Sequence, residues 1–299
     1  MRWYFALDET GAAGQTGADA KTAVLSAGAA GGLEPFLLYH GNRNDFTHWM
    51  TRHGVTIIDT TPSFMDVIQQ AQSAGTYKPH SIGHWLRVAI PLVETAHEFV
   101  LYTDCDVIFL KPENWAAIRP KLFAAAPEFK RDNWNYFNAG VMVLNVPEMR
   151  RTYGAFESHI IARITGGAHP YYDDEWALNE AYRGFWEKLD PSLNWKPYWG
   201  FSAAAKILHF HGPKLNAIEP IAAGAWTADN PTANALKNLL TGHQRAYQTW
   251  LSTLGDHLQL TDPTTAIRLS AAAAAIKKMP APENVDLNLL NFQMFPDSP

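Results

Sequence analysis

The chain of 299 residues contains a single cysteine, Cys105. One thiol cannot form an intrachain disulfide framework, and a zinc cluster needs several thiolates or histidines at short spacing. The chain also lacks a surplus of basic residues, with 24 lysines and arginines against 29 acidic residues and a formal net charge of -5. A basic surface for nucleic acid is therefore not expected, whereas a small anionic ligand needs only a local group of basic residues.

Long apolar stretches are scarce as well. The opening "MRWYFALDET" reaches Asp8 before an apolar region of signal-peptide length can form. Elsewhere we find no uncharged apolar stretch of the length that crossing a bilayer requires. We therefore expect no signal peptide and no transmembrane segment, and the single thiol favours a cytoplasmic location.

The sequence instead shows apolar, strand-like runs that alternate with helix-like segments. The strand-like runs occupy residues 3–7, 35–41, 54–59 and 98–110. The helix-like segments occupy residues 18–28 and 63–75, which both end at glycine, and residues 81–96. Ser63 is the expected N-terminal cap of the second helix. This alternation predicts an α/β fold, a mostly parallel sheet with helices on both faces.

The second half of the chain is less regular. Strand character returns at residues 136–146 and 206–214, with a short helix expected at 174–184 between them. After Gly224 the pattern becomes helical, and proline-containing residues 280–299 read as an extended tail. We therefore expect one α/β domain over residues 1–224, followed by a helical C-terminal extension and tail over residues 225–299.

Two aspartates one residue apart, Asp104 and Asp106, interrupt the apolar run "FVLYTDCDVIFL". If the strand leaves the sheet at Thr103, both carboxylates lie at its carboxyl end, where ligands bind in α/β sheets. Side chains two residues apart point to the same side, so two hard oxygen donors would face one Mg²⁺ or Mn²⁺ ion. The alternative is that one carboxylate caps a turn and the other is solvated.

From Ser81 to Lys214 the chain resembles glycosyltransferase family 8, whose members have the GT-A fold and include glycogenin and bacterial lipopolysaccharide galactosyltransferases. Four blocks carry the resemblance, in the family's order: "SIGHWLRVAIP", "VLYTDCDVIFLKP", "YFNAGVMVLN" and "ILHFHGPK". Before Ser81 only Asp8 matches the family. The resemblance implies a GT-A fold with a Rossmann-like sheet, and makes residues 1–224 a nucleotide-sugar-binding and catalytic domain. It also implies a metal-dependent enzyme that transfers a hexose, most often glucose or galactose, from a UDP-sugar. The sugar would keep its anomeric configuration.

The resemblance also implies a metal site for Mn²⁺ or Mg²⁺. Asp104 and Asp106 are two of its ligands, the family's DxD motif, and His209 is the third. His211 is expected on the same face of the strand and is the alternative ligand, and a purely structural, hydrogen-bonded histidine is a further alternative. Lys214 would place a positive charge against the donor diphosphate, with a solvated surface lysine as the alternative.

The late motif departs from the family pattern around that lysine. The spacing from His209 to Lys214 is one residue shorter than in the relatives, and Leu215 and Asn216 stand where a tryptophan is common. Gly212 would let the backbone approach the phosphates closely.

Several further positions match the family's donor site. Arg87 would bridge phosphate and sugar with its forked donors, or form a salt bridge on a helix surface. Asn138 would contact the donor sugar, with the small Ala139 leaving room for a ring, and its alternative is a turn asparagine. Asp8 would accept a hydrogen bond from uracil. Cys105 falls among the donor-site positions, although its side chain should point into the fold as a small buried hydrophobe.

The segment "YYDDEWALNEA" departs most from the family, in which it reads like D-Q-D-x-L-N. Asp174 matches the first aspartate, Glu175 the glutamine, and Trp176 replaces the second acid. We hypothesise that Glu175 stabilises positive charge on the sugar ring or attacks it, while Asp174 bonds sugar hydroxyls. The alternative is that this acidic run only favours a helix N-terminus.

Two other classes of protein are compatible with these residues. A haloacid-dehalogenase-type phosphatase also has D-x-D after a strand, and would use Asp104 as its nucleophile. A non-catalytic protein that binds a nucleotide sugar would need the same motifs. The sequence does not identify the hydroxyl acceptor, which can be a saccharide, a lipid-linked sugar, a protein or a small molecule, and it does not indicate an oligomeric state.

Overall fold

A computed structural model describes residues 1–78, 81–167, 169 and 172–281. Its centre is a seven-stranded sheet of order β3-β2-β1-β4-β7-β6-β8. The strands are β1 (Arg2–Asp8), β2 (Glu34–His40), β3 (Thr56–Asp59), β4 (Phe99–Thr103), β6 (Phe123–Pro127), β7 (Phe137–Asn145) and β8 (Glu187–Lys188). Only β7 runs against the others, because it pairs antiparallel with both β4 and β6. The carboxyl ends of β1, β4 and β6 therefore meet the beginning of β7 at one edge of the sheet.

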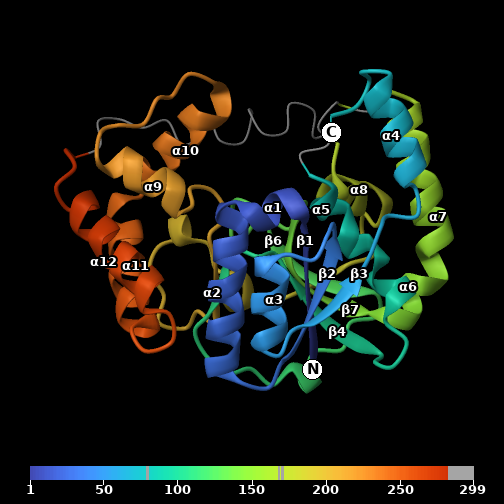
Figure 1. Cartoon of the computed structure of the whole chain (residues 1–299), viewed down its shortest axis with the longest axis horizontal. Helices are drawn as coiled ribbons and strands as arrows, with labels where there is room; N and C mark the ends of the chain where they lie inside the picture. Colours follow the sequence, from blue (N-terminus) through green and yellow to red (C-terminus); the bar gives the residue numbers. More distant parts are fainter. Residues whose placement is uncertain (79–80, 168, 170–171, 282–299) are drawn as a thin grey trace.

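Helices cover both faces of this sheet (Figure 1). One face carries α1 (Glu9–Ala13), α2 (Gln15–Ala30) and α3 (Asp45–Arg52). The other carries α4 (Met65–Ser73), α5 (Ile82–Leu86), α6 (Ile90–Val93), α7 (Val146–Thr165) and α8 (Asp174–Ala181). The alternation of side chains along β1 divides them between the two layers, with Trp3 and Phe5 packing toward α2 and Tyr4 toward the opposite layer. The predicted α/β class, with a mostly parallel sheet between helices, is confirmed.

The predicted strand at 98–110 is divided in two. β4 ends at Thr103, and β5 (Val107–Phe109) belongs to a second, two-stranded sheet with β9 (Ile207–His209). The backbone leaves the main sheet at Asp104 and pairs Val107 with His209 in the antiparallel register of the small sheet. A motif from the middle of the chain is thereby held beside a motif about a hundred residues later.

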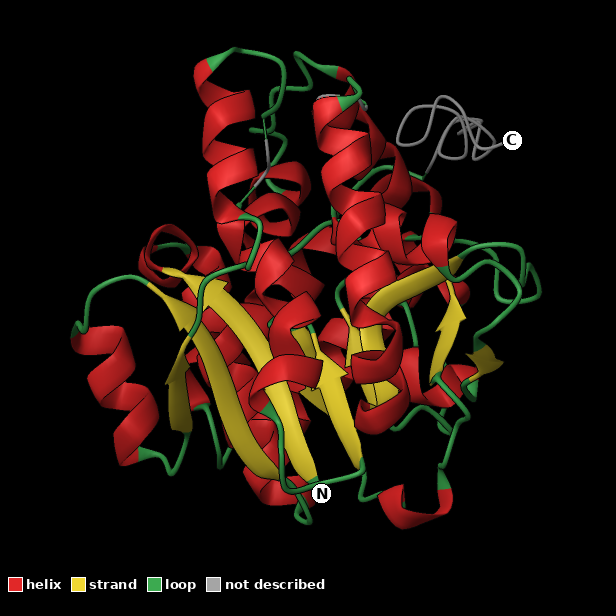
Figure 2. Cartoon of the chain, turned by 90° about the vertical axis from the view of Figure 1, so that its right-hand side faces the viewer, coloured by secondary structure: helices red, strands yellow, loops and turns green. Residues whose placement is uncertain are grey.

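The C-terminal helices form a separate layer beside the small sheet, at the left of Figure 1. Figure 2 views the molecule from the right-hand side of Figure 1, where helices pack against the strands of the main sheet. They are α9 (Leu215–Ala222), α10 (Pro231–Gly242), α11 (Gln244–Leu258) and α12 (Pro263–Ile276). Their apolar cluster includes Ile108 of β5 and Leu208 of β9 as well as Trp250 of α11. This cluster crosses position 224, where the sequence suggested a boundary, and that boundary stays a prediction. Among the described helices, none combines the length and apolar character needed to span a bilayer.

Some local expectations were wrong. Ser63 does not cap α4, whose N-cap is Phe64, because the serine hydroxyl instead bonds the hydroxyl of Tyr153 at 2.7 Å. The first predicted helix continues through Gly28 and ends at Gly31. The helix expected at 81–96 is divided into α5, a 3₁₀ turn (Arg87–Ala89) and α6. Most of the expected tail, residues 282–299, lies outside the described residues.

Short 3₁₀ segments complete the described chain. They are Trp115–Ala117, Pro191–Asn194 and Pro197–Trp199. The second of these precedes an isolated bridge between Trp195 and Leu208, which adds a further backbone link to β9. The irregular segment around Asn194 is thus fixed against the small sheet.

Candidate functional site

The two aspartates of the interrupted strand and one histidine lie together where the main sheet meets the small one. The Nε2 atom of His209 is 3.4 Å from an oxygen of Asp106 and 3.8 Å from an oxygen of Asp104. His209 and Asp106 are buried, whereas Asp104 is partly exposed. The pairing of β5 with β9 explains this meeting, since the amide of Phe210 also donates to the carbonyl of Asp106 at 2.8 Å. The three side chains were predicted to share one site, and the fold places them together.

These three residues fit a divalent cation. One ligand atom from each lies within 4.8 Å of the others, and two carboxylates with an imidazole suit Mn²⁺ or Mg²⁺. Burial by itself would raise the pKa of Asp106, but the ammonium of Lys214 and the imidazole of His209 together lower that pKa below its usual range. Burial opposes ionisation of Asp104 too, and Arg87 lowers its pKa. Both carboxylates are therefore held in the anionic form that ligates a cation.

His211 points to different partners. Its Nε2 atom lies 2.8 Å from Glu128, and its Nδ1 atom lies 2.7 Å from the hydroxyl of Tyr198. The rings of His209 and His211 have centroids 5.7 Å apart, so both project to the same side, as expected. Of the two, His209 is the one grouped with the aspartates.

Arg87 is a buried link between the strands of the site. Its guanidinium donates to Asp104 at 2.8 Å and to the carbonyl of Ala139 at 2.7 Å, and it forms an ion pair with Asp174. The guanidinium carbon Cζ of Arg87 also lies 4.5 Å from the ring centroid of Tyr102. In this arrangement Arg87 orients Asp104 and links it to Asp174, and its contact with phosphate and sugar stays a prediction.

Lys214, at the N-terminus of α9, contacts the carboxylate oxygen of Asp106 that does not face His209. Its Nζ atom is 2.6 Å from Asp106 Oδ2, and its side chain is 35% exposed. Gly212 has a φ of 99°, and a Cβ atom there would lie 2.6 Å from Leu239, so the turn that delivers Lys214 requires glycine. The solvated surface lysine is thus not what the structure shows.

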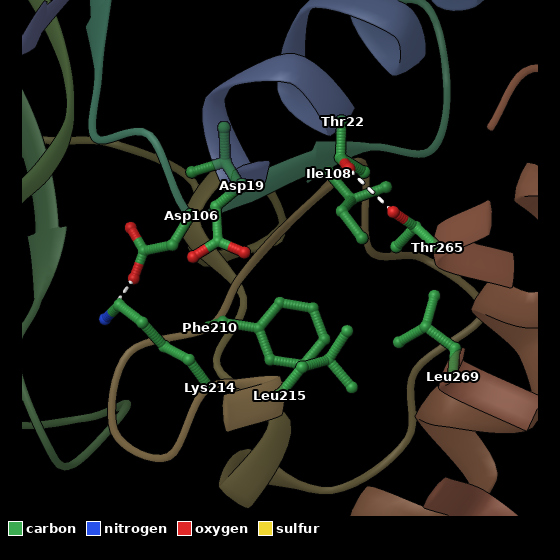
Figure 3. A pocket seen from close by; sticks show the side chains of 10 residues that line it. Asp19, Thr22, Asp106, Ile108, Phe210, Lys214, Leu215, Thr265 and Leu269 are labelled. Atoms are coloured by element: carbon green, nitrogen blue, oxygen red, sulfur yellow. Dashed lines mark hydrogen bonds and ion pairs between the residues drawn. The ribbon is translucent and has the colours of Figure 1, made fainter. Parts of the chain in front are cut away.

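A small cavity of about 20 Å³ adjoins this lysine, between α2 and the C-terminal helices. Figure 3 shows Asp19 of α2 and Asp106 on the same side of it, facing Lys214. Asp19 Oδ1 accepts a hydrogen bond from Gln15 at 2.8 Å, whereas the buried Oδ2 has no hydrogen-bond partner within the described part of the chain. Burial raises the pKa of Asp19 to about 6. Asp19 was not among the residues singled out from the sequence.

Asn138 and Glu175 meet at the start of β7. The amide of Asn138 donates to Glu175 Oε2 at 3.1 Å, and the backbone N–H of Ala139 donates to the same oxygen at 2.7 Å. Asn138 is not a turn residue, since it lies inside a strand and is 3% exposed. Burial, and then the charge of Glu128, raise the pKa of Glu175 well above its usual range.

Asp174 and its neighbour Asp173 open helix α8. Asp173 caps the helix by accepting from the amide of Trp176 at 3.0 Å, so the expected helix N-terminus is present. Asp174 is buried and pairs with Arg87, and burial raises its pKa to about 6 against the opposing effect of that arginine. His84, Asp173 and Asp174 form another group with cation-ligating atoms close together. The arginine already occupies Asp174 in that group.

Asp8 and Cys105 are occupied by protein contacts. The carboxylate of Asp8 accepts from Gly11 N at 2.7 Å, Gly83 N at 3.1 Å and Ser81 Oγ at 2.5 Å. It joins the end of β1 to the start of α5. The thiol of Cys105 points into the core and donates to the carbonyl of Ala6 at 3.5 Å. Its side chain is therefore the buried hydrophobe expected from its position, and only its backbone can face a donor.

Sequence reasoning missed two further buried groups here. Asn194 is fully buried and hydrogen-bonds both His209 and Asn138, at 2.9 Å each. Lys196 is also fully buried, donates to the carbonyl of Pro127 at 2.7 Å, and has its pKa lowered to about 7 by burial. Both lie in the irregular segment after α8, which has no periodic pattern to draw attention to them.

No protein-family model matches the sequence, and no curated protein matches it either. Solved structures do resemble the fold. The galactosyltransferase LgtC, solved with donor and acceptor sugar analogues, superposes with a TM-score of 0.53 at 17% identity, over 81% of this chain and 96% of LgtC. The chain has the GT-A fold.

Two other enzymes with the GT-A fold are similar. GlyE, a glycosyltransferase of Streptococcus pneumoniae TIGR4, gives a TM-score of 0.52 at 16% identity, over 77% of this chain and 56% of GlyE. The bifunctional glycosyltransferase WbbM gives 0.51 at 13% identity, over 72% of this chain and 46% of WbbM. An active-site mutant of LgtC in which glutamate replaces glutamine superposes as well as the complex does. At these identities the likeness establishes the fold, as the sequence resemblance predicted.

Proposed function

We propose that this protein is a metal-dependent glycosyltransferase that transfers a hexose, glucose or galactose, from a UDP-sugar to a hydroxyl acceptor with retention of configuration. The observation that carries the proposal is the group formed by Asp104, Asp106 and His209, with Lys214 beside it, at the ligand-binding edge of a GT-A fold. The GT-A neighbours include an enzyme solved with donor and acceptor sugar analogues.

The three residues would hold Mn²⁺ or Mg²⁺. When bound, such a cation offsets the negative charge that develops on the departing diphosphate. Lys214 would add a point charge against the same diphosphate, for which it must turn from Asp106 toward the donor. Arg87 orients Asp104 by donating a hydrogen bond to its carboxylate, and it also donates to the carbonyl of Ala139.

The other donor contacts remain as the resemblance implies. Asp8 would accept from the uracil ring; a carboxylate has about four lone-pair directions and three are used by protein donors. Asn138 and Ala139 would face the sugar, and Gly212 the phosphates. Asp174 would bond sugar hydroxyls with the oxygen that does not meet Arg87.

Glu175 would act on the sugar itself. Its carboxylate is held by the amide of Asn138 and the N–H of Ala139, which fixes its direction beside the site. Retention can follow from two successive inversions, in which this carboxylate displaces the diphosphate and the acceptor oxygen then displaces the carboxylate. It can also follow from attack by the acceptor on the face that the diphosphate leaves, with a diphosphate oxygen taking the acceptor's proton. In LgtC an active-site glutamine has been changed to glutamate, and the family resemblance puts Glu175 at a glutamine position.

The proposal is tested by incubating the protein with a panel of nucleotide sugars and measuring free UDP by anion-exchange chromatography. We expect slow hydrolysis of UDP-glucose or UDP-galactose that requires Mn²⁺ and stops with EDTA. Release of phosphate from simple esters, without a nucleotide, would instead support a phosphatase. Tight binding of UDP-sugar with no hydrolysis, and no transfer to any offered saccharide, would support a binding protein.

The acceptor and the cellular location are not tested by this screen. Saccharide, lipid-linked, protein and small-molecule hydroxyls all remain candidates, and the cytoplasmic location stays a prediction from the single thiol. Once a donor is known, the same assay with acceptor mixtures separates transfer from hydrolysis, because transfer adds a glycosylated product without changing the UDP signal.

A further inference from the structure

A continuous line of hydrogen bonds joins Glu175 to His209. Glu175 Oε2 accepts from the amide of Asn138 at 3.1 Å, Asn138 Oδ1 accepts from the amide of Asn194 at 2.9 Å, and Asn194 Oδ1 lies 2.9 Å from His209 Nδ1. Asn138, Asn194 and His209 are at most 3% exposed. Water is thus largely excluded from the line, so each group depends on its protein partner.

The backbone N–H of Gly140 determines which atom is the donor and which the acceptor in each hydrogen bond of this line. The N–H of Gly140 donates to Asn138 at 3.1 Å, and an N–H can only donate, so the Asn138 atom that meets it is oxygen. The other end of that amide is then nitrogen, which agrees with its contact to Glu175. Since Asn138 presents oxygen to Asn194, Asn194 must present nitrogen to it, and therefore oxygen to His209.

The same logic fixes the imidazole. Because Asn194 presents an acceptor, His209 Nδ1 must carry the proton. In the neutral ring the lone pair is then on Nε2, the atom that faces Asp106 at 3.4 Å and Asp104 at 3.8 Å. Three lone-pair-bearing groups converge there, which suits a cation between them.

Gly140 also makes space for the ring in this orientation. A Cβ atom on Gly140 would lie 2.2 Å from His209 Cε1 and 2.8 Å from Nδ1. The glycine is not needed for its backbone angles, because its φ is not positive. Its value at this place in β7 is the room it leaves for the imidazole.

We propose that Asn194 is a positioning residue that sets the tautomer of His209 and, through Asn138, ties the orientation of that ligand to Glu175. The inference rests on the proposed cation site. Asn194 lies outside the four sequence blocks, so no role had been predicted for it. Through its hydrogen bonds, the cation ligands and the sugar-facing carboxylate of Glu175 belong to one hydrogen-bonded network.

The tautomer can be observed directly, without metal or donor. In protein labelled with ¹⁵N-histidine and treated with EDTA, long-range ¹H–¹⁵N spectra at a pH where the ring is neutral distinguish Nδ1–H from Nε2–H. The His209 signal is assigned by its loss in His209→Gln. We expect the Nδ1–H form in the wild type and a shift toward Nε2–H in Asn194→Ala. A wild-type ring in the Nε2–H form would overturn the proposal.

Mn²⁺ affinity, measured by electron paramagnetic resonance, gives a second readout. Asn194→Ala should weaken Mn²⁺ binding about 10- to 100-fold. In Asn194→Asp the side chain still accepts from His209 but cannot donate to Asn138. This variant should keep the Nδ1–H tautomer and bind Mn²⁺ at least as tightly as the wild type. It should nevertheless lose UDP-sugar hydrolysis, because the connection to Glu175 is broken. Asn234→Ala, an exposed change on α10, is the matched control.

The outcomes separate this inference from the proposed function. If the wild type shows the Nδ1–H ring but binds no Mn²⁺, the metal-dependent function fails while the tautomer assignment stands. If the wild type binds Mn²⁺ and Asn194→Ala changes neither the tautomer nor the affinity, the positioning role is wrong. Equal losses of Mn²⁺ binding in Asn194→Ala and Asn194→Asp would also contradict it.

Discussion

The two sides of Asp106 differ in how the polar groups next to this residue are paired. On the sheet side, His209, Asn194 and Asn138 form an unbroken hydrogen-bonded line to Glu175. On the side of the C-terminal helices, Lys214 pairs directly with Asp106 beside a small cavity, and Asp19 has a buried oxygen with no hydrogen-bond partner among the described residues (Figure 3).

This difference follows from what builds each side. The sheet side is made of paired strands and a buried loop bridged to β9, so backbone hydrogen bonds fix each side chain. The other side is a contact between helices, and a lysine 35% exposed is free to exchange partners. Under the proposed function, the first arrangement would hold the cation ligands in place, and the second would leave one charge able to turn toward the donor diphosphate.

The largest effect is expected where the two sides meet. Asp106→Asn removes a carboxylate from the cation group and the partner of Lys214 in one step. We expect Mn²⁺ binding to be lost and UDP-sugar hydrolysis to fall about 1000-fold. Equilibrium dialysis of Mn²⁺ and UDP release measure the two effects. Asp256→Asn, exposed on α11, is the control, and wild-type Mn²⁺ affinity in the Asp106 variant would refute the assignment.

A substitution on the sheet side tests whether Glu175, at the end of the hydrogen-bonded line, takes part in the reaction or only supports the structure. Glu175→Gln retains an oxygen that can accept from Asn138 and Ala139, so the line to His209 should survive. We expect Mn²⁺ affinity to stay within a few-fold and turnover to fall about 100-fold. Glu180→Gln on the same helix, whose carboxylate pairs with Arg163, is the control. Full turnover in the Glu175 variant removes any nucleophilic role.

A change on the helix side should act in two directions. Lys214→Ala frees Asp106 from a competing cation, so Mn²⁺ alone should bind more tightly. The same variant loses a charge against the diphosphate, so the KM for UDP-sugar should rise about 10-fold or more. Lys237→Ala removes an exposed lysine from α10 and serves as control. If both affinities fall together, the lysine has only a structural part.

The sequence sufficed for the fold and for the main members of the site. Alternating strand and helix patterns predicted the layered sheet, and the DxD motif at a strand end placed Asp104 and Asp106 correctly at its edge. His209 could be matched to them only through the family resemblance, because periodicity shows which face of an element is buried and not which distant strand it will pair with. The pairing of β5 with β9 supplies that information.

The residues that were missed share a different cause. Asn194 lies in a 3₁₀ turn and Asp19 in an alanine-rich helix, and neither local pattern distinguishes them from ordinary polar residues. Their importance arises from what packs against them: β9 and β7 for Asn194, and the C-terminal helices for Asp19. The error at Ser63 has the same origin, since a tertiary partner, Tyr153, replaced the local cap.

The smallest effect on turnover is expected at Asp19, where a substitution should act on stability alone. Burial raises its pKa from 3.8 to about 6, so the folded state binds the proton more tightly than the unfolded state does. The stability of the wild type should therefore decrease as the pH rises through this range, by at most about 3 kcal/mol. Asp19→Asn keeps an oxygen for Gln15 and has no charge to bury. It should be more stable than the wild type at pH 8.

Urea unfolding in EDTA at pH 5 and pH 8 measures this difference. The advantage of Asp19→Asn should be larger at pH 8, whereas Asp256→Asn, being exposed, should show the same small change at both. A variant less stable than the wild type at pH 8 would mean that the Asp19 carboxylate is paired in solution, with Lys214 as the nearest candidate in the shared cavity. The two sides of Asp106 would then be equally well paired, and Lys214 would have two acidic partners before any donor binds.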